Sequence, residues 1–246
     1  MQIIKIFGIK FSSYDNMNEF RNHIKNFLST DNCKSIFTPN AEMIARTVED
    51  KSFREVLKRS EVNLPDGVGI LLLAKKKGIR INRFPGIEAM LEILKLAEDL
   101  KIPIYFLGAK KEVVESMVNR IKIRYPNLVI AGYRDGYFKR EEEENIISEI
   151  NNSGAKILFV ALGFPKQEFF IDKYKDKLKV NIAIGVGGSF DVLSGKKKRA
   201  PKIIRELNLE WFYRLLQDPK RILSRFPNLI RFIRFYFRYK DHEEVN

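Results

Sequence analysis

Asp66 is the residue of this sequence best suited by its position to acid–base chemistry. It follows the short apolar run Val62–Leu64 and Pro65, within the segment LPDGVG. A carboxylate held where a strand ends and a helix begins can act as a general base. It can equally cap the helix that follows, because aspartate oxygens accept hydrogen bonds from free N–H groups. The local sequence leaves both interpretations open.

Three other segments place polar residues between an apolar run and a helical pattern. Thr38 and Asn40, in FTPNAEM, are suited either to cap a helix or to hold a sugar or phosphate at its amino-terminal end. Arg83, in NRFPG, is suited to bind a diphosphate through two parallel hydrogen bonds. Gln167, in GFPKQE, belongs either to an exposed loop or to a cleft beyond a buried strand.

A glycine-rich turn follows the apolar segment Ile182–Ile184. In IGVGGSF, Gly187 and Gly188 allow a ligand to approach the backbone closely. The turn does not match the dinucleotide fingerprint GxGxxG, because Phe190 takes the place of the third glycine. The chain also lacks the phosphate-binding pattern GxxxxGK[ST] and the acidic DxD pattern of many metal-dependent sugar transferases. These absences count against a dinucleotide-dependent oxidoreductase and against a P-loop NTPase.

The elements that must position these residues form an alternating pattern through residues 1–195. Runs such as ILFVAL are apolar on both faces, which is typical of a parallel sheet covered by helices. The predicted fold class is therefore α/β, with a Rossmann-like, mostly parallel sheet flanked by helices. We expect strands at Ile3–Phe7, Ser35–Phe37, Val62–Leu64, Ile104–Leu107, Val129–Ala131, Ile157–Ala161 and Ile182–Ile184. We expect helices at Met17–Leu28, Ala41–Asp50, Gly67–Lys77, Ile87–Leu100, Glu112–Tyr125, Glu141–Asn151 and Gln167–Tyr174.

Composition narrows the function classes. The one cysteine, Cys33, excludes an intramolecular disulfide framework, and two histidines with one cysteine are too few for a His/Cys zinc cluster. The apolar N-terminus is interrupted by Lys5 and Lys10, which favours a strand over a signal peptide. No uncharged apolar run reaches the ~18 residues needed to cross a bilayer.

Charge divides the chain into two parts. Of the net charge of +14, residues 196–246 carry +8, from 14 basic and 6 acidic residues, and residues 1–195 carry the other +6. We predict a catalytic core at residues 1–195 and a basic helical appendage at residues 196–246. Such asymmetry indicates a polyanionic partner, either an anionic membrane surface or a nucleic acid.

The end of the appendage has the pattern of a basic amphipathic helix. At ~100° per residue, Arg231, Arg234 and Arg238 share one face, and Leu229, Ile233, Tyr236 and Phe237 lie opposite. Such a helix is suited to lie in a membrane interface. It can instead pack on the core or on a neighbouring protomer of a homo-oligomer. The residues predicted to contact the membrane are Arg231, Phe232, Arg234, Phe235, Tyr236 and Arg238.

Taken together and in this order, the motifs resemble one family, the WecG/TagA/CpsF glycosyltransferases. The resemblance covers Ile3 to Arg221 and is carried by TPNAEM, PDGVGI, RFPG, GFPKQE, GVGGSFDVLSG, RAP and LEWFYRLLQDPKR. It implies an inverting, metal-independent transfer of a sugar from a UDP-sugar donor to a polyprenyl-diphosphate-linked sugar. It also implies a peripheral location on the cytoplasmic face of the membrane and a role in teichoic acid or surface polysaccharide synthesis. N-acetylmannosamine, its uronic acid and glucose are all compatible donor sugars.

The same resemblance implies roles for single residues. Asp66 becomes the candidate general base, and Arg83 binds a diphosphate or the departing UDP. Glu88 stands where the family commonly has aspartate, so no role is assigned to it. The residues implied to line the substrate site are Thr38, Asn40, Gln167, Gly187, Gly188, Arg214 and Arg221, the two arginines closing over it from the appendage.

Nucleic-acid binding is the main alternative function, since arginines interleaved with aromatics also suit single strands. Against it, the chain shows no RRM, KH or zinc-finger signature, and the polar loops would be left unexplained. The resemblance implies no cofactor and no nucleic-acid partner.

Overall fold

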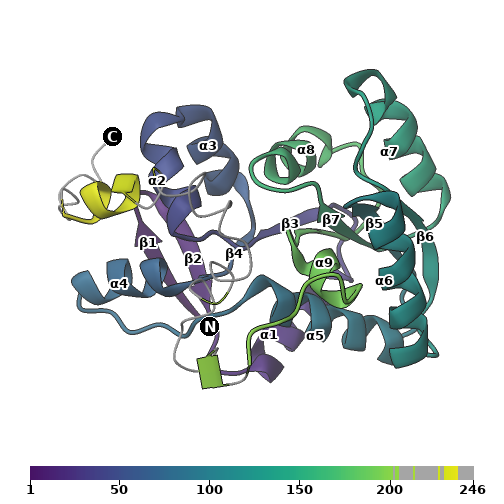
Figure 1. The fold of residues 1–246 in the computed structure, drawn as a ribbon, viewed down its shortest axis with the longest axis horizontal. Coiled ribbons are helices and arrows are strands. Elements are labelled where there is room, and N and C mark those ends of the chain that lie inside the picture. Colours follow the sequence, from purple (N-terminus) through teal and green to yellow (C-terminus); the bar gives the residue numbers. More distant parts are fainter. Residues whose placement is uncertain (202, 205–212, 214–226, 228–229, 238–246) are drawn as a thin grey trace.

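A computed structural model describes residues 1–201, 203–204, 213, 227 and 230–237. Its central feature is a parallel sheet of six strands in the order β4-β3-β8-β7-β5-β6 (Figure 1). This architecture confirms the predicted Rossmann-like α/β class. The strands of the sheet are β3 (Lys34–Phe37), β4 (Val62–Asn63), β5 (Ile104–Gly108), β6 (Ile130–Arg134), β7 (Ile157–Ala161) and β8 (Ile182–Gly185).

Both faces of the sheet are covered by helices, as expected for strands that are apolar throughout. Along β7, Leu158 and Val160 point to one apolar cluster, and Ile157 and Phe159 point to the other. The second cluster is completed by α1 (Met17–Phe27), α5 (Gly86–Asp99), α6 (Lys111–Arg124) and α9 (Ser189–Leu193). The first is completed by α7 (Glu143–Asn152) and α8 (Lys166–Tyr174), with the 3-10 turn Arg140–Glu142 leading into α7, and by the helices beside the N-terminal hairpin.

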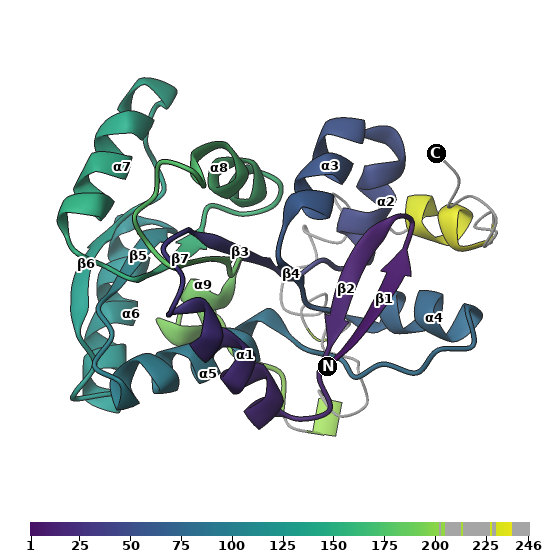
Figure 2. The same ribbon diagram turned by 180° about the vertical axis from the view of Figure 1, so that it is seen from behind.

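The N-terminal strand is not part of the main sheet, which corrects the expectation that it belongs to the parallel core. β1 (Gln2–Ile6) pairs antiparallel with β2 (Ile9–Ser13), a strand the sequence did not predict. The hairpin packs with α2 (Ala41–Glu49), α3 (Lys51–Arg59) and α4 (Val68–Lys76) at one end of the molecule (Figure 2). α2 to α4 lie between β3 and β5 in the chain, so the parallel sheet and this second layer are built from interleaved segments.

The helix expected at Ala41–Asp50 is confirmed to within one residue, and a second helix, α3, follows it directly because Asp50 ends one and starts the other. Asp50 follows α2, and its backbone N–H donates to Arg46. Its side chain accepts the N–H of Phe53 at 3.0 Å, which caps the unpredicted helix α3. The other helices predicted within residues 1–195 are confirmed to within about two residues at their ends.

Residues 230–237 of the predicted appendage form a helix, and this helix packs on the layer of α2, α3 and α4. Phe232 and Phe235 are buried there, and the ring of Phe235 meets Phe7 edge-on at a centroid distance of 5.4 Å. The prediction that Phe232 and Phe235 contact a membrane is therefore wrong for these two side chains, because the core already covers them. Ile233 and Phe237 are exposed on the same helix.

Three predicted residues, Arg214, Arg221 and Arg238, lie outside the residues that the structure describes. Most of residues 196–246 also lie outside the residues that the structure describes. The division of the chain into a core and an appendage at residue 195 therefore stays a prediction. Arg231 is described and pairs with Glu49 of α2 at 2.8 Å.

Gly108 gives a direct test of how the sheet ends. It has φ of 133°, and a Cβ there would overlap the backbone carbonyl of Ala161 on the neighbouring strand. We expect Gly108→Ala to lower the free energy of unfolding by about 3 kcal/mol, from overlap added to the cost of a positive φ. Gly154→Ala is the matched control, because Gly154 also has positive φ (72°) but no atom within 4 Å of the added carbon. The control should lose only about 1 kcal/mol in urea unfolding, and equal losses would contradict this account of β5.

Candidate active site

Four loops that carry predicted site residues leave four neighbouring strands at the same edge of the sheet. The strands are β4, β3, β8 and β7, and every pairing among them is parallel. Their carboxyl ends therefore lie side by side, which is where open α/β sheets bind ligands. Asp66 follows β4, Thr38 and Asn40 follow β3, Gly187 and Gly188 follow β8, and Gln167 follows β7.

Asp66 is held by contacts from three segments. Its backbone N–H donates to Pro39 O at 3.1 Å, which ties the loop after β4 to the loop after β3. One carboxylate oxygen lies 3.5 Å from Nη2 of Arg83, and the other lies 3.4 Å from the N–H of Gly86. Gly86 is the first residue of α5, so the carboxylate sits at the positive end of that helix.

The alternative that Asp66 caps the next helix is wrong, because α4 has no side-chain cap. Its carboxylate instead faces Arg83 and α5, and the side chain keeps 28% of its surface exposed. This combination orients the carboxylate and keeps part of it at the surface of the protein. The arrangement suits a general base next to a cation that can hold a phosphate.

The two predicted site residues of the loop after β3 make different contacts. Asn40 caps α2, since its Oδ1 accepts the N–H of Met43 at 3.1 Å, and this confirms the capping interpretation for Asn40. Thr38 is half-buried and packs against Gly86, where an added Cβ would come within 3.0 Å of Thr38 Oγ1. Thr38 and Asp66 therefore both adjoin Gly86 in the first turn of α5. Their contacts with substrate stay predictions.

Gln167 is buried rather than part of an exposed loop, with only 4% of its surface exposed. Its Oε1 accepts the N–H of Gly187 at 3.0 Å, and its Nε2 donates to Glu168 at 2.7 Å. The side chain also lies against Gly185, where a Cβ would come within 2.9 Å of Nε2. Gln167 thus fixes the turn after β8 from within the protein.

Glu168 is a residue that sequence reasoning missed. It is fully buried, and its Oε1 accepts the hydrogen bond from Gln167. Among the residues that the structure describes, none donates to its Oε2. Burial raises the pKa of Glu168 to about 7, so the carboxyl group is partly protonated near neutral pH. The only sequence signal was a charged residue beside Gln167 in the PKQE motif.

Glu88 also has a partner that the sequence did not indicate. Arg199, in the RAP motif, donates from Nη2 to Glu88 Oε1, near the amino-terminal end of α5. This ion pair links the segment that follows α9 to the helix against which Asp66 rests. It gives Glu88 a structural partner without assigning it a role in the reaction.

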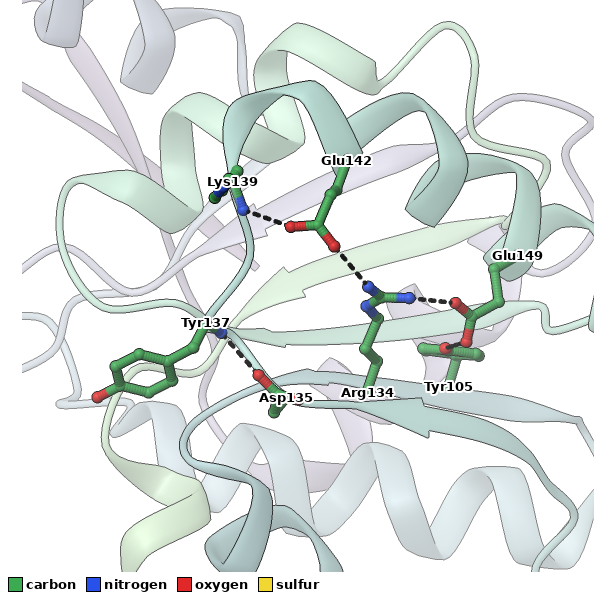
Figure 3. Close-up of polar contacts among 7 residues, drawn as sticks. All are labelled: Tyr105, Arg134, Asp135, Tyr137, Lys139, Glu142 and Glu149. Carbon is green, nitrogen blue, oxygen red and sulfur yellow. Dashed lines mark hydrogen bonds and ion pairs between the residues drawn. The ribbon is translucent and has the colours of Figure 1, made fainter.

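A second polar cluster lies at the other end of the same sheet edge, beside β6 (Figure 3). Arg134 donates to Glu149 at 2.9 Å and pairs with Glu142 at 3.2 Å, and Tyr105 donates to Glu149. Burial and Glu149 raise the pKa of Tyr105. These contacts close the loop from β6 to α7 on itself, and Tyr137 points away from them, 73% exposed.

Within the described residues, no three His, Cys, Asp or Glu side chains are grouped so as to hold a metal ion. The same part of the chain contains no helix long and apolar enough to cross a membrane.

Comparison with known proteins identifies a family for this chain. The family model described as "Glycosyl transferase WecG/TagA/CpsF family" matches residues 4–245.

This chain belongs to the WecG/TagA/CpsF family of glycosyltransferases.

Curated relatives support the assignment at high coverage. A protein of Bacillus subtilis strain 168 is 40% identical over 77% of this chain and 75% of its own length. A protein of Staphylococcus aureus strain MW2 is 35% identical over 89% of this chain and 86% of its own. Both are named N-acetylglucosaminyldiphosphoundecaprenol N-acetyl-beta-D-mannosaminyltransferase, as is a relative from Bacillus spizizenii that is 37% identical.

The glycosyltransferase is accordingly a hexosyltransferase of this family, as the motifs indicated. The family assignment replaces the alternative functions, a nucleic-acid-binding protein and an oxidoreductase. The structure brings Asp66, Arg83 and Thr38 together around the start of α5, while Asn40 caps α2 and lies near Gly67. Along the same edge, the turn at residues 187–188 follows β8, one strand from β3, and Gln167 follows β7, two strands from β3.

The raised pKa of Glu168 has a consequence for stability. Between pH ~4.5 and ~7 the folded state holds a proton that the unfolded state has released, so stability falls as pH rises through that range and is level above it. Glu168→Gln cannot ionise and should remove up to about 3 kcal/mol of this pH dependence. Urea unfolding at a series of pH values measures it.

The matched control is Glu141→Gln, at an exposed position of the segment before α7. It should keep the full slope between pH ~4.5 and ~7. A wild-type slope in Glu168→Gln would show that Glu168 is ionised in the folded protein throughout the range, contrary to the expected effect of its burial.

Proposed function

We propose that this glycosyltransferase moves N-acetylmannosamine from UDP-N-acetylmannosamine to N-acetylglucosaminyl-diphosphoundecaprenol, a step of teichoic acid synthesis. The shared name of relatives that are 35–40% identical over most of the chain supports the acceptor and the transferred sugar, and the UDP of the donor is what the family resemblance implies. The observation that carries the mechanism is the carboxylate of Asp66, open to solvent between Arg83 and the first turn of α5.

In the proposed reaction Asp66 accepts the proton of the acceptor hydroxyl. The hydroxyl oxygen attacks C1 of the donor sugar from the face opposite UDP, the bond from C1 to the UDP oxygen breaks, and UDP leaves with the electron pair. A single displacement of this kind inverts the configuration at C1.

Negative charge develops on the departing diphosphate as the bond breaks. Nη2 of Arg83 lies 3.5 Å from the Asp66 carboxylate, and the Arg83 guanidinium can neutralise that charge without a metal or cofactor. The N–H of Gly188 offers a further donor, in a turn that Gln167 holds in place through the N–H of Gly187. Thr38 and Asn40 line the side of the acceptor sugar, and Arg214 and Arg221 close over the site from the appendage.

The location proposed for the enzyme is peripheral, on the cytoplasmic face of the cell membrane. The acceptor named for the relatives is anchored by an undecaprenyl chain. On the helix at residues 230–237, Ile233 and Phe237 are exposed beside Arg234. Exposed apolar and basic side chains on one helix suit an anionic membrane surface.

Asp66→Asn tests the base. The amide keeps the size of the side chain but cannot accept the proton, so kcat should fall by about 10²–10⁴-fold while thermal unfolding is unchanged. The assay measures UDP released from UDP-N-acetylmannosamine in the presence of a short-chain lipid-diphosphate N-acetylglucosamine acceptor. Asp176→Asn, at an exposed position after α8, serves as control and should retain wild-type turnover. Near-normal turnover by Asp66→Asn would remove Asp66 from the role of base.

A further inference from the structure

Helix α4 has a composition that its burial does not explain. Its sequence VGILLLAKK is apolar around the whole helix before two lysines end it. A helix of this kind is usually buried on all sides. Here only Ile70, Leu73 and Ala74 are buried, and Leu72 is 41% exposed. The outward face of α4 is therefore apolar and, within the part of the chain that the structure describes, exposed at Leu72 and partly exposed at Val68 and Leu71.

The exposed face of α4 adjoins the exposed face of the helix at residues 230–237. Gly69 lies on the side of α4 that meets this helix, because a Cβ there would come within 2.9 Å of the Phe232 ring. Seven residues further along α4, Lys76 Nζ donates to Tyr236 O at 2.6 Å. Leu72 is three residues after Gly69 and four residues before Lys76, so the three positions share one side of α4. Figure 1 shows the two helices side by side at the end of the molecule away from the main sheet.

The segment that carries the apolar face ends in positive charge. Residues 68–80 contain four basic residues and no acidic one, the bases being Lys75, Lys76, Lys77 and Arg80. Lys77 Nζ donates to Lys5 O of the hairpin at 3.0 Å, and Lys5 is paired in register with Lys10. Like charges opposite one another on two strands destabilise a hairpin. A polyanionic surface would compensate for that repulsion.

We propose that the outward face of α4, with the basic residues at its end, is a second membrane-contacting surface of the enzyme, in addition to the helix at residues 230–237. Its occupant is an anionic lipid bilayer. Val68, Leu71 and Leu72 meet the acyl boundary, and Lys75 and Arg80 meet lipid phosphates. With nine residues, α4 is too short to cross the bilayer, so it lies along the interface.

This surface connects the membrane to the site without any large intervening segment. Asp66 precedes the first residue of α4 by two positions, and only Gly67 lies between them. An enzyme seated on α4 would hold its base at the height of the lipid headgroups, where the diphosphate of a lipid-linked acceptor lies. That consequence rests on the proposed function, whereas the binding surface does not.

Two variants of the full chain separate the charged and apolar contributions. Lys75→Gln with Arg80→Gln removes two exposed cations, and should weaken binding to phosphatidylcholine vesicles containing phosphatidylglycerol about thirtyfold. Leu72→Gln should weaken it about fivefold. The matched controls are Lys95→Gln with Lys122→Gln, on α5 and α6, and Leu100→Gln, because Leu100 is 40% exposed and so resembles Leu72. Vesicle flotation measures binding, and all controls should float as the wild type does.

Wild-type flotation by both α4 variants, or no flotation of the wild type, would overturn the proposal. A change in molar mass by analytical ultracentrifugation for Leu72→Gln, without a change in flotation, would assign the face to a second copy of the chain instead. Transfer to the short-chain soluble acceptor should be unchanged in both variants. A wild-type enzyme that floats but transfers no sugar would contradict the proposed function and leave the membrane surface standing.

Discussion

Parallel pairing of four adjacent strands is the constraint on which the site depends. β3 pairs with β4 through Ile36 and Val62, and with β8 through Ile36 and Ile184. β8 continues to β7, where Ile184 faces Phe159. These registers bring the four strand ends to one level, so loops separated by up to 150 positions in the chain open at one edge. A shift of one residue in any strand would exchange its two apolar faces and move its loop out of the group.

The two halves of the site are held in different ways. Around Asp66 the contacts are long and partly solvent-exposed, and they join three loops at the start of α5. Around Gln167 they are short and buried, and they run from Glu168 through the amide to Gly187. The buried half needs a glycine at position 185, because the Gln167 side chain takes the space of a Cβ. In the proposed reaction the buried turn serves the diphosphate, and the partly exposed carboxylate of Asp66 serves the acceptor hydroxyl.

The sequence predicted the sheet and most of its helices because its strands are apolar on both faces and its helices carry clear stripes. It also singled out Asp66, Arg83 and Gln167 from their places after strands. It could not show that β1 leaves the main sheet, since a strand's partner is not written in its own residues. It also placed Phe232 and Phe235 outward, because a helical pattern with aromatics on several sides does not reveal which side the core occupies. Glu168 escaped notice because burial, and not residue type, sets its pKa.

The central claim is that one edge of the sheet holds both the nucleotide diphosphate and the catalytic base. Amide hydrogen exchange of the full chain, with and without UDP, tests it most directly. The account predicts slower exchange on UDP binding at residues 83–86 and 186–188, with residues 134–139 of the second polar cluster unchanged. Protection confined to the second cluster, or bound UDP with no protection at residues 83–86 and 186–188, would contradict it.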